Sequence, residues 1–423
     1  MLRTEDNEKI TRVGPGTPCG EFMRRYWQPA LMSSELPEND GAPVRVRLLG
    51  EDLIAFRDST GAIGLVDAYC PHRRAPMFFG RNEECGLRCV YHGWKFDRNG
   101  DCVDMPSEPA GTPLQAKVKI KSYPCVDKGG LIWTYMGPKE KMPEPPDYEF
   151  LRVPATHAHV SKTYEHCNWL QGLEGGLDTA HSSFLHNNDI GNRDMPRNRD
   201  KAPRLDVELT DYGYRYVSHR KADAGQEYVR VYHYVMPAQQ IRANLIKIEG
   251  GRSNKPKFDG HLWVPVDDEG TMVYNTMYGY DASVPLEQDY LMDMESRMGR
   301  GAEHFIHGTF KLKQNMSNDY WIDRQDQKTT TFTGIPGVNT QDFALQEGMG
   351  AVVDRSKENL GASDKAIVAM RRQVLRAIDA VANGETPPGV DPATHRNIRP
   401  HDEYLSEGAD WRVEFASELQ AKW

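Results

Sequence analysis

Residues Cys70–Trp94 read CPHRRAPMFFGRNEECGLRCVYHGW. A Cys-x-His pair, Cys70 and His72, is followed by a Cys-x-x-His pair, Cys89 and His92, with sixteen residues between His72 and Cys89. Zinc sites usually place two Cys close together and two His close together. Here each half of the motif supplies one of each, which favours a cluster of two unlike irons, one held by thiolates and one by imidazoles.

The residues around the quartet suit the same interpretation. Pro71 and Gly93 fit tight loops that turn backbone N–H groups towards the sulfurs, and such hydrogen bonds tune a reduction potential. The pattern C-P-H-R…C-x-Y-H-G-W is similar to the signature of Rieske ferredoxins and Rieske oxygenases. The disulfide-bearing Rieske proteins that oxidise quinols match less well, because only Cys85 is left over nearby and we expect it to be a free thiol. A zinc site and a chance arrangement are the alternatives.

The bulk properties are those of a globular protein with more than one domain. The chain has 423 residues and a net charge of −9, which argues against general nucleic-acid binding. It has no apolar run of about 18 residues and begins with a polar, acidic stretch, so we expect no membrane span and a cytoplasmic location. An electron carrier needs about 100 residues, so roughly 270 remain for another task.

The chain divides into two parts with different patterns. Short alternating segments up to about residue 135 predict an antiparallel β domain, into which the Cys/His stretch is inserted. The Pro-rich segment 138–150 predicts a linker. Beyond it, residues 163–186 resemble a helix and 203–282 several strands. Residues 363–384 predict a helix with Ser363 as N-cap and a stop at Asn383-Gly384.

A second group of ligand-type residues follows the linker. His181 and His186 would lie about 140° apart on a regular helix, so either the helix ends between them or they are unrelated. Glu174, Asp178 and His181 would share one helical face, and such a row is costly to bury without a metal or partners. Two His and one carboxylate form the facial triad of non-haem Fe(II) oxygenases.

At this point nearly the whole chain resembles the oxygenase (α) component of the Rieske non-haem iron aromatic-ring oxygenases. The nearest likeness is to the group that contains phthalate dioxygenase, phenoxybenzoate dioxygenase and dehydrodivanillate O-demethylase. The matching segments are GPGTPCGEFMRRYW near the start, the quartet, the Asp-x2-His-x4-His segment, HLWVPVDDEG (261–270) and the stretch from Tyr320 to Gly361.

The resemblance implies a role for individual residues. His181 and His186 would bind a mononuclear iron, and Asp342, in the Gln341-Asp342…Glu347 setting, would be the third ligand. Asp178 would bridge His181 to a cluster His of a neighbouring subunit; the alternatives are a solvated helix-start Asp for Asp342 and a plain salt bridge for Asp178. The role of Glu174 stays open between support of the metal site and structure.

The resemblance also implies the architecture, α+β in class. An all-β Rieske [2Fe–2S] domain with an N-terminal helical segment (1–137) would be followed by the linker (138–150). A helix-grip (START-like) catalytic domain with a curved antiparallel sheet would occupy residues 151–423.

The implied activity is O₂-dependent oxidation of an aromatic carboxylate or related compound, by ring hydroxylation or dihydroxylation. The cofactors would be the Rieske cluster and one Fe(II), with NAD(P)H acting only through a flavin and iron–sulfur reductase or a ferredoxin. The chain would assemble as a homotrimer or homohexamer. One alternative is O-demethylation of a lignin-derived methoxy aromatic; another is an electron-transfer protein with a non-catalytic ligand-binding domain.

The substrate itself is not determined by these patterns. An aromatic carboxylate would call for a cationic side chain in the second sheet, and strand alternation gives each candidate about an even chance of facing inward. The candidates are Arg204, Arg215, Arg230, Arg242 and Lys247.

Overall fold

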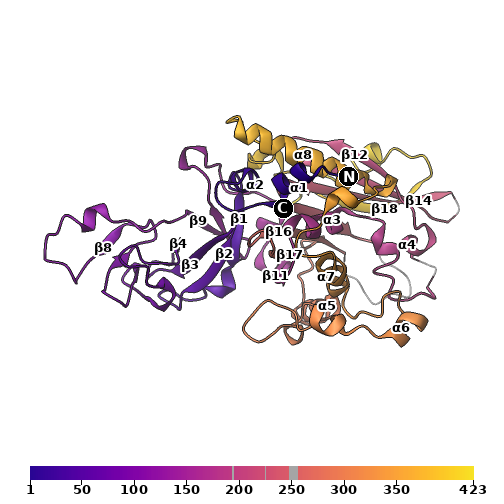
Figure 1. Ribbon diagram of the computed structural model, residues 1–423. Helices are drawn as coiled ribbons and strands as arrows, with labels where there is room; N and C mark the ends of the chain where they lie inside the picture. Colours follow the sequence, from indigo (N-terminus) through magenta and orange to yellow (C-terminus); the bar gives the residue numbers. More distant parts are fainter. Residues whose placement is uncertain (193–194, 224, 247–255) are drawn as a thin grey trace.

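A computed structural model describes residues 1–192, 195–223, 225–246 and 256–423. An elongated β-rich lobe projects from a larger lobe of helices and strands, and both termini lie on the larger lobe (Figure 1). Lys247, one of the candidate cations, lies outside the described residues. Within the described residues, no helix combines the length and the apolar character needed to cross a bilayer.

The projecting lobe is built from small antiparallel sheets. The predicted strands after residue 43 are confirmed and form a β2–β3–β4 sheet. A second sheet has the order β5–β6–β7–β8 and a third the order β1–β10–β9. The strands are β1 (Trp27–Met32), β2 (Val44–Leu48), β3 (Glu51–Arg57), β4 (Ile63–Asp67), β5 (Arg81–Glu83), β6 (Gly86–Arg88), β7 (Lys95–Phe96), β8 (Cys102–Asp104), β9 (Cys125–Lys128) and β10 (Leu131–Tyr135).

The larger lobe is organised around one antiparallel sheet. Its order is β11–β17–β16–β15–β14–β13–β12, and β18 pairs with the first half of β14. The strands are β11 (Ala158–Glu165), β12 (Arg204–Leu209), β13 (Gly213–Lys221), β14 (Gln226–Val235), β15 (Gln239–Asn244), β16 (Lys257–Pro265), β17 (Thr271–Gly279) and β18 (His401–Ser406). This sheet with its helices confirms the predicted α+β class and the strands expected between residues 203 and 282.

Helices cover this sheet and position the site. Helix α3 (Trp169–Leu177) contacts β15 and β16, and α8 (Lys365–Ala382) contacts β12 and β13. The indole ring of Trp263 packs closely against α3 at Gly176. A larger residue could not stand there, because its Cβ would overlap the ring. The remaining helices are α1 (Thr4–Thr11), α2 (Pro18–Met23), α4 (Pro196–Arg199), α5 (Gln288–Met298), α6 (Arg324–Thr329), α7 (Val338–Gly348) and α9 (Trp411–Glu414).

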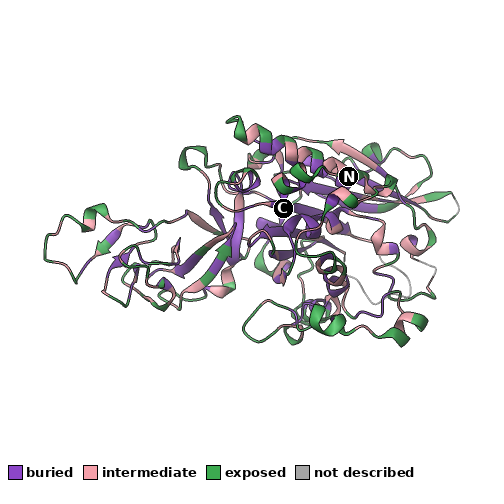
Figure 2. Ribbon diagram, in the orientation of Figure 1, coloured by how far each residue is buried: buried purple, intermediate pink, exposed green. Residues whose placement is uncertain are grey.

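Buried residues concentrate where strands and helices face one another (Figure 2). On the β13–β14 side, valines 217, 229 and 231 pack against Trp411 and Phe415 of the C-terminal segment. Helices α1 and α2 contact α8, so the first residues of the chain lie against the larger lobe. At the end of the predicted linker, buried Glu149 pairs with Arg399 at 2.8 Å. The division at residues 137 and 150 stays a prediction.

The helix predicted over residues 163–186 is wrong at both ends. Residues 158–165 form β11, because they pair with β17 across the sheet. Asn168 then caps α3 by accepting a hydrogen bond from the backbone N–H of Leu170 at 3.2 Å. The helix ends at Leu177, so His181 and His186 both lie beyond it and the 140° separation does not apply.

The helix predicted over residues 363–384 is nearly right. A 3₁₀ turn occupies residues 362–364, so α8 begins at Lys365 with Asp364 rather than Ser363 as its N-cap. Its C-cap is Asn383, and Gly384 follows with φ +82°, as the predicted stop requires.

Candidate functional site

The two halves of the Cys/His quartet have the same backbone geometry. The carbonyl oxygen of Cys70 accepts a hydrogen bond from Arg74, and that of Cys89 from Gly93, both at 2.9 Å and four residues on. Arg74 and Gly93 both have positive φ, +60° and +81°. Two matching loops therefore present their side chains towards each other, and both Cys residues are buried.

The two imidazoles of the quartet lie together between these loops. The ring centroids of His72 and His92 are 4.4 Å apart, and His72 stacks on Trp94 at 4.3 Å. Trp94 is held in turn by a hydrogen bond from its Nε1 to Ser107 Oγ at 3.1 Å. Both imidazoles are only partly buried, so a cluster held here would have its histidine edge near the surface. Cys85 is exposed and free, as expected.

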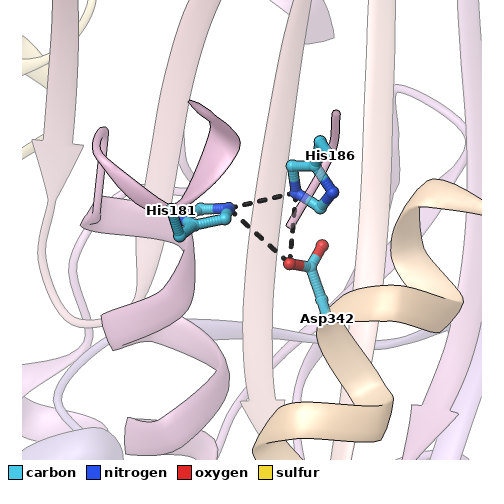
Figure 3. A group of neighbouring side chains, drawn as sticks. All are labelled: His181, His186 and Asp342. Atoms are coloured by element: carbon cyan, nitrogen blue, oxygen red, sulfur yellow. Dashed lines mark hydrogen bonds and ion pairs between the residues drawn. The ribbon is translucent and has the colours of Figure 1, made fainter. Parts of the chain in front are cut away.

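Three residues of the larger lobe bring one donor atom each to a single point. Nε2 of His181 lies 3.0 Å from Nε2 of His186, and Asp342 Oδ1 lies 3.7 Å and 3.3 Å from these two nitrogens. His181 begins the 3₁₀ turn after α3, His186 follows in the next turn, and Asp342 comes from α7 (Figure 3). All three were chosen from the sequence, and among the described residues they form the group suited to a metal ion.

An acceptor on the far side of each imidazole indicates which nitrogen faces inward, through a hydrogen bond for His186 and through a nearby carboxylate for His181. The side-chain amide of Gln341 donates from Nε2 to Asn188 Oδ1 at 2.8 Å and to the carbonyl oxygen of Ile335 at 2.9 Å, which fixes its orientation. Its Oε1 therefore accepts from Nδ1 of His186 at 2.9 Å. Nδ1 of His181 faces Asp178 Oδ2 at 3.7 Å. Both Nε2 atoms are thus left with a lone pair that points to Asp342.

This arrangement fits a bound cation. Two imidazole lone pairs and a carboxylate converge in a buried place, and they repel one another unless a metal ion or a proton lies between them. Two His and one carboxylate leave other positions around a metal open, which is the donor set of non-haem Fe(II) oxygenases.

The charges at this point are coupled when no metal is bound. Burial by itself lowers the pKa of His181, but the carboxylates of Asp178 and Asp342 outweigh burial and raise that pKa above its ordinary value. Burial by itself raises the pKa of Asp342, but His186 and His181 lower it overall. A cation at this point must displace the proton shared by these groups, so its affinity should fall in acid.

Asp178 lies between the protein surface and the three residues His181, His186 and Asp342, which we call the metal-type group. As the C-cap residue of α3, it accepts hydrogen bonds at Oδ1 from the backbone N–H of Ala180 at 2.7 Å and of His181 at 3.4 Å. Burial raises its pKa, but His181 and these N–H groups lower it overall, so the carboxylate is ionised. Its side chain keeps 25% of its surface exposed, which leaves room for a group outside the chain.

A cavity of about 380 Å³ opens beside the three donor residues. Alternate residues of β14, β15, β16 and β17 face it, and α3, α5 and α7 close it on the other sides. Six arginines line it, namely Arg197, Arg220, Arg230, Arg242, Arg297 and Arg300. The first four form no ion pair with a described carboxylate, although the carboxylates of Asp178, Asp259, Glu295, Asp342 and Asp402 also line the cavity. We call these four arginines the cationic wall.

Comparison with known proteins agrees with both sites. The Rieske [2Fe-2S] domain family matches residues 26–124, and the family described as LigXa C-terminal domain like matches residues 134–422. The chain is 39% identical to a phthalate 4,5-dioxygenase oxygenase subunit of Pseudomonas putida, over 97% of this chain and 94% of the relative. It is 36% identical to a 5,5′-dehydrodivanillate O-demethylase oxygenase subunit of a Sphingobium species, over 94% and 86%.

The chain belongs to the Rieske oxygenase family. It is an oxygenase component whose cofactors are a Rieske [2Fe–2S] cluster and a mononuclear non-haem iron, and it receives electrons from a reductase or ferredoxin. The fold agrees: a crystal structure of dicamba monooxygenase bound to dicamba superimposes with a TM-score of 0.60, at 17% identity, over 86% of this chain and 99% of that one.

Glu174 has a structural position in this Rieske oxygenase. It lies inside α3, and its carboxylate pairs with Arg355 at 2.9 Å and with Arg371 at 2.6 Å. Because α3 ends before His181, the face expected to join Glu174, Asp178 and His181 does not exist. Glu174 instead ties α3 to α8 through Arg371.

The Arg residues considered as ligands of a substrate carboxylate lie in two kinds of place, outside the cavity and in its wall. Arg204 pairs with Asp206 and Arg215 with Glu208, and neither lines the cavity, whereas Arg230 and Arg242 do. Sequence reasoning missed Arg197, Arg220 and Gln341. Alternation along YRYVSHRK could have suggested Arg220, and the position directly before Asp342 could have suggested Gln341.

Arg220 supports the loop that carries His181. Its guanidinium donates to the carbonyl oxygen of Thr179 at 2.6 Å and to Ser183 Oγ at 3.1 Å. It is therefore bonded on both sides of His181, to the backbone of Thr179 and to the side chain of Ser183. Arg242 is different: it is partly exposed to the cavity and donates to Nε2 of His261 at 3.2 Å.

Proposed function

We propose that this Rieske oxygenase oxidises an aromatic carboxylate, or a closely related aromatic compound, with O₂. The outcome is ring hydroxylation, dihydroxylation or O-demethylation, and the electrons come from NAD(P)H through a flavin and iron–sulfur reductase or a ferredoxin. One observation carries the proposal: His181, His186 and Asp342 open onto a cavity lined by guanidinium groups that make no ion pair with a described carboxylate. Relatives named for phthalate, 3-chlorobenzoate and dehydrodivanillate support the substrate class.

The residues of the cavity have separable tasks in this proposal. Arg242 binds the substrate carboxylate by a charge-assisted hydrogen bond, and His261 orients Arg242. The apolar side chains of Trp263, Val273 and Phe343 hold the ring and exclude water. Iron, when bound by His181, His186 and Asp342, supplies the place at which O₂ accepts electrons.

Asp178 is proposed to carry electrons between subunits. Its carboxylate contacts His181 on one side and is a quarter exposed on the other, so a cluster histidine of a neighbouring chain can reach it. The cluster loops carry exposed apolar side chains that suit such a contact, namely Tyr69, Phe79, Val90 and Tyr91. We therefore propose a cyclic homo-oligomer, a trimer or a pair of trimers, with cluster and iron paired across each interface.

The activity is tested with protein carrying both metal centres, a compatible reductase and NADH. Phthalates, hydroxybenzoates, phenoxybenzoates and methoxybenzoates are screened for O₂ uptake, with detection of formaldehyde and of diol. Formaldehyde identifies O-demethylation, and a diol identifies ring dihydroxylation. If no aromatic acid stimulates O₂ uptake while uncharged aromatics do, the carboxylate class is wrong.

The alternative of an electron-transfer protein without catalytic iron makes a different prediction. A Rieske cluster contains two irons, so that protein would hold about two per chain and an oxygenase about three. His181→Ala should remove one iron from the oxygenase and leave the cluster spectrum unchanged. An unchanged iron content in that variant would favour the electron-transfer protein.

A further inference from the structure

The end of the cavity next to strand β11 carries a second polar cluster. His159 lies on β11, Glu295 on α5, and Arg300 just after α5, and all three line the cavity that His181, His186 and Asp342 also line. Glu295 is 8% exposed and Arg300 is 7% exposed. His159 and Glu295 belong neither to the metal-type group nor to the cationic wall, and Arg300 differs from the arginines of that wall because it is paired with Glu295.

The cluster is an ion pair with an incomplete hydrogen-bond pattern. Arg300 Nη2 donates to Glu295 Oε1 at 2.9 Å, and Nε2 of His159 lies 3.4 Å from the same oxygen. Among the described residues, Arg300 Nε, Glu295 Oε2 and His159 Nε2 make no hydrogen bond of normal geometry, and Asn275 Oδ1 on the neighbouring strand makes none either. An unpartnered buried polar atom destabilises the fold unless a ligand or a water completes its hydrogen bonds.

Packing alone does not explain why polar residues stand here. Helix α5 already has an apolar contact with the sheet, formed by Leu291 and Met294 against Met277 of β17. A buried pair of Arg and Glu usually closes with two parallel hydrogen bonds, whereas this one makes a single bond. The ion pair therefore leaves one donor, Arg300 Nε–H, and one acceptor, Glu295 Oε2, unused.

The sheet register places this cluster across the cavity from Arg242. One row of paired residues runs His159–Met277–Asp259–Arg242 over β11, β17, β16 and β15. Three strand spacings separate its ends, or about 14 Å between backbones. Side chains reaching inward from both ends leave a span that suits a single aromatic ring with a polar group at each end.

The unused atoms of Glu295 and Arg300 determine which substituent of an aromatic ring can bind here. Burial raises the pKa of Glu295, but Arg300 and His159 lower it overall, so Glu295 is ionised and accepts hydrogen bonds only. Arg300 Nε–H only donates. A hydroxyl group both donates and accepts, so it can satisfy the two at once. A second carboxylate cannot donate to Glu295 and would be repelled by it.

We propose that His159, Glu295 and Arg300 form a subsite for a hydroxyl substituent on the ring of an aromatic carboxylate that Arg242 holds at the opposite end. The inference rests on the proposed function and makes it narrower: hydroxybenzoate-type acids bind, and benzene dicarboxylates bind poorly. His159 and Arg300 both approach Oε1 of Glu295, so His159 helps to keep the Glu295 carboxylate ionised and oriented.

The test measures binding by titration calorimetry, under anaerobic conditions, with protein carrying both metal centres. The ligands are benzoate, 3- and 4-hydroxybenzoate, isophthalate and terephthalate. One hydroxybenzoate should bind at least about tenfold more tightly than benzoate, because its hydroxyl bonds to charged groups. Both dicarboxylates should bind more weakly than benzoate.

Glu295→Gln should remove the discrimination and leave the anchor at Arg242 intact. We expect benzoate affinity within about twofold of the unmodified protein, with the hydroxyl preference lost and the dicarboxylates gaining affinity. Glu303→Gln, an exposed change nearby, is the matched control and should change nothing. If the Glu295 variant does not fold, His159→Phe should weaken the same preference.

The outcomes separate the two proposals. Benzoate binding without any hydroxyl preference, or a preference that survives both variants, overturns the subsite and leaves the carboxylate class standing. Failure of benzoate and of every other aromatic acid to bind overturns the carboxylate class, and the subsite with it.

Discussion

Gln341 Oε1 accepts a hydrogen bond from Nδ1 of His186 at 2.9 Å, and the next residue on helix α7 is Asp342. One helix therefore supplies both a metal-type carboxylate and the group that orients an imidazole beside it. Donation from Gln341 Nε2 to Asn188 and Ile335 prevents the amide from turning over. The position of His186 thus depends on a residue that would not itself touch the metal.

Replacing Gln341 with Leu should loosen the mononuclear iron without affecting the cluster. Without its acceptor, His186 loses its fixed tautomer and ring orientation, which typically costs 10–100-fold in metal affinity, an order-of-magnitude expectation. The measurement is iron retained during timed exposure to a chelator, with the visible spectrum of the cluster as an internal reference. Gln325→Leu on exposed α6 is the control. Equal iron retention in the Gln341 variant and the control would contradict the orienting role.

Replacing Asp178 with Asn should keep both metal centres and slow the transfer of electrons between them. Asn retains an oxygen for the N–H of Ala180 but has no charge to offer His181 or a cluster histidine. We expect reoxidation of the chemically reduced protein by O₂, in the presence of substrate, to slow by at least about tenfold. Stopped-flow absorbance of the cluster measures this rate. Normal reoxidation with full iron content would remove Asp178 from the electron path.

Replacing His92 with Cys should lower the reduction potential of the cluster. Rieske clusters span about −150 to +300 mV, whereas plant-type clusters with four thiolates lie near about −400 mV. A third thiolate adds negative charge and stabilises the oxidised state. A redox titration followed by electron paramagnetic resonance gives the midpoint. An unchanged midpoint would show that His92 is not a ligand.

Local motifs could be recognised from the sequence, whereas distant partners could not. The quartet spans only residues 70–92, and its two loops repeat one hydrogen-bond pattern, so spacing alone predicts it. His181 and His186 are also close in sequence. Asp342 lies far along the chain, and only resemblance to a family pointed to it. Its approach to the two imidazoles depends on how α7 packs against α3, which no local pattern encodes.

The errors have a common physical origin in long-range pairing. Residues 163–165, predicted as the start of a helix, instead end strand β11, because β17 pairs with residues 158–165 over their whole length. The role of Glu174 could not be decided from the sequence, because its partners Arg355 and Arg371 lie some 180 to 200 positions further on. Alternation gave Arg230 and Arg242 only an even chance of facing inward, and the packed sheet shows that both line the cavity.

Replacing Glu174 with Gln should destabilise the larger lobe by about 3–5 kcal/mol, because it leaves the buried guanidinium of Arg355 without its counter-charge and leaves Arg371 with Glu358 alone. Arg355 is completely buried and Arg371 is 4% exposed. Denaturant unfolding followed by circular dichroism measures the loss, with exposed Glu385→Gln as the control. A loss below about 1 kcal/mol, the range of surface ion pairs, would contradict this account.

The same carboxylate predicts the acid sensitivity of the fold. Burial raises the pKa of Glu174, but Arg355 and Arg371 lower it overall, so its pKa in the folded protein lies below the unfolded value of about 4.3. Its contribution is therefore complete above about pH 4.3 and is lost as the pH falls through the folded pKa. The unmodified protein should lose more stability than the Glu174→Gln variant between about pH 5 and 3. Parallel pH profiles of the two proteins would contradict the role.

Replacing Arg242 with Gln should weaken the binding of aromatic carboxylates and spare that of uncharged analogues. Arg242 is partly exposed to the cavity and makes no ion pair with a described carboxylate, so its charge is available to a ligand. Losing a hydrogen bond between charged groups should raise KM for the acid by about 10–100-fold, with a smaller effect on kcat. The affinity for the corresponding primary amide should change little, because the amide carries no charge for Arg242 to attract. Arg215→Gln, which breaks the pair with Glu208 outside the cavity, should leave both affinities unchanged. If Arg242→Gln lowers kcat for acid and amide alike while KM stays the same, the guanidinium acts on the metal-type group and not on the substrate.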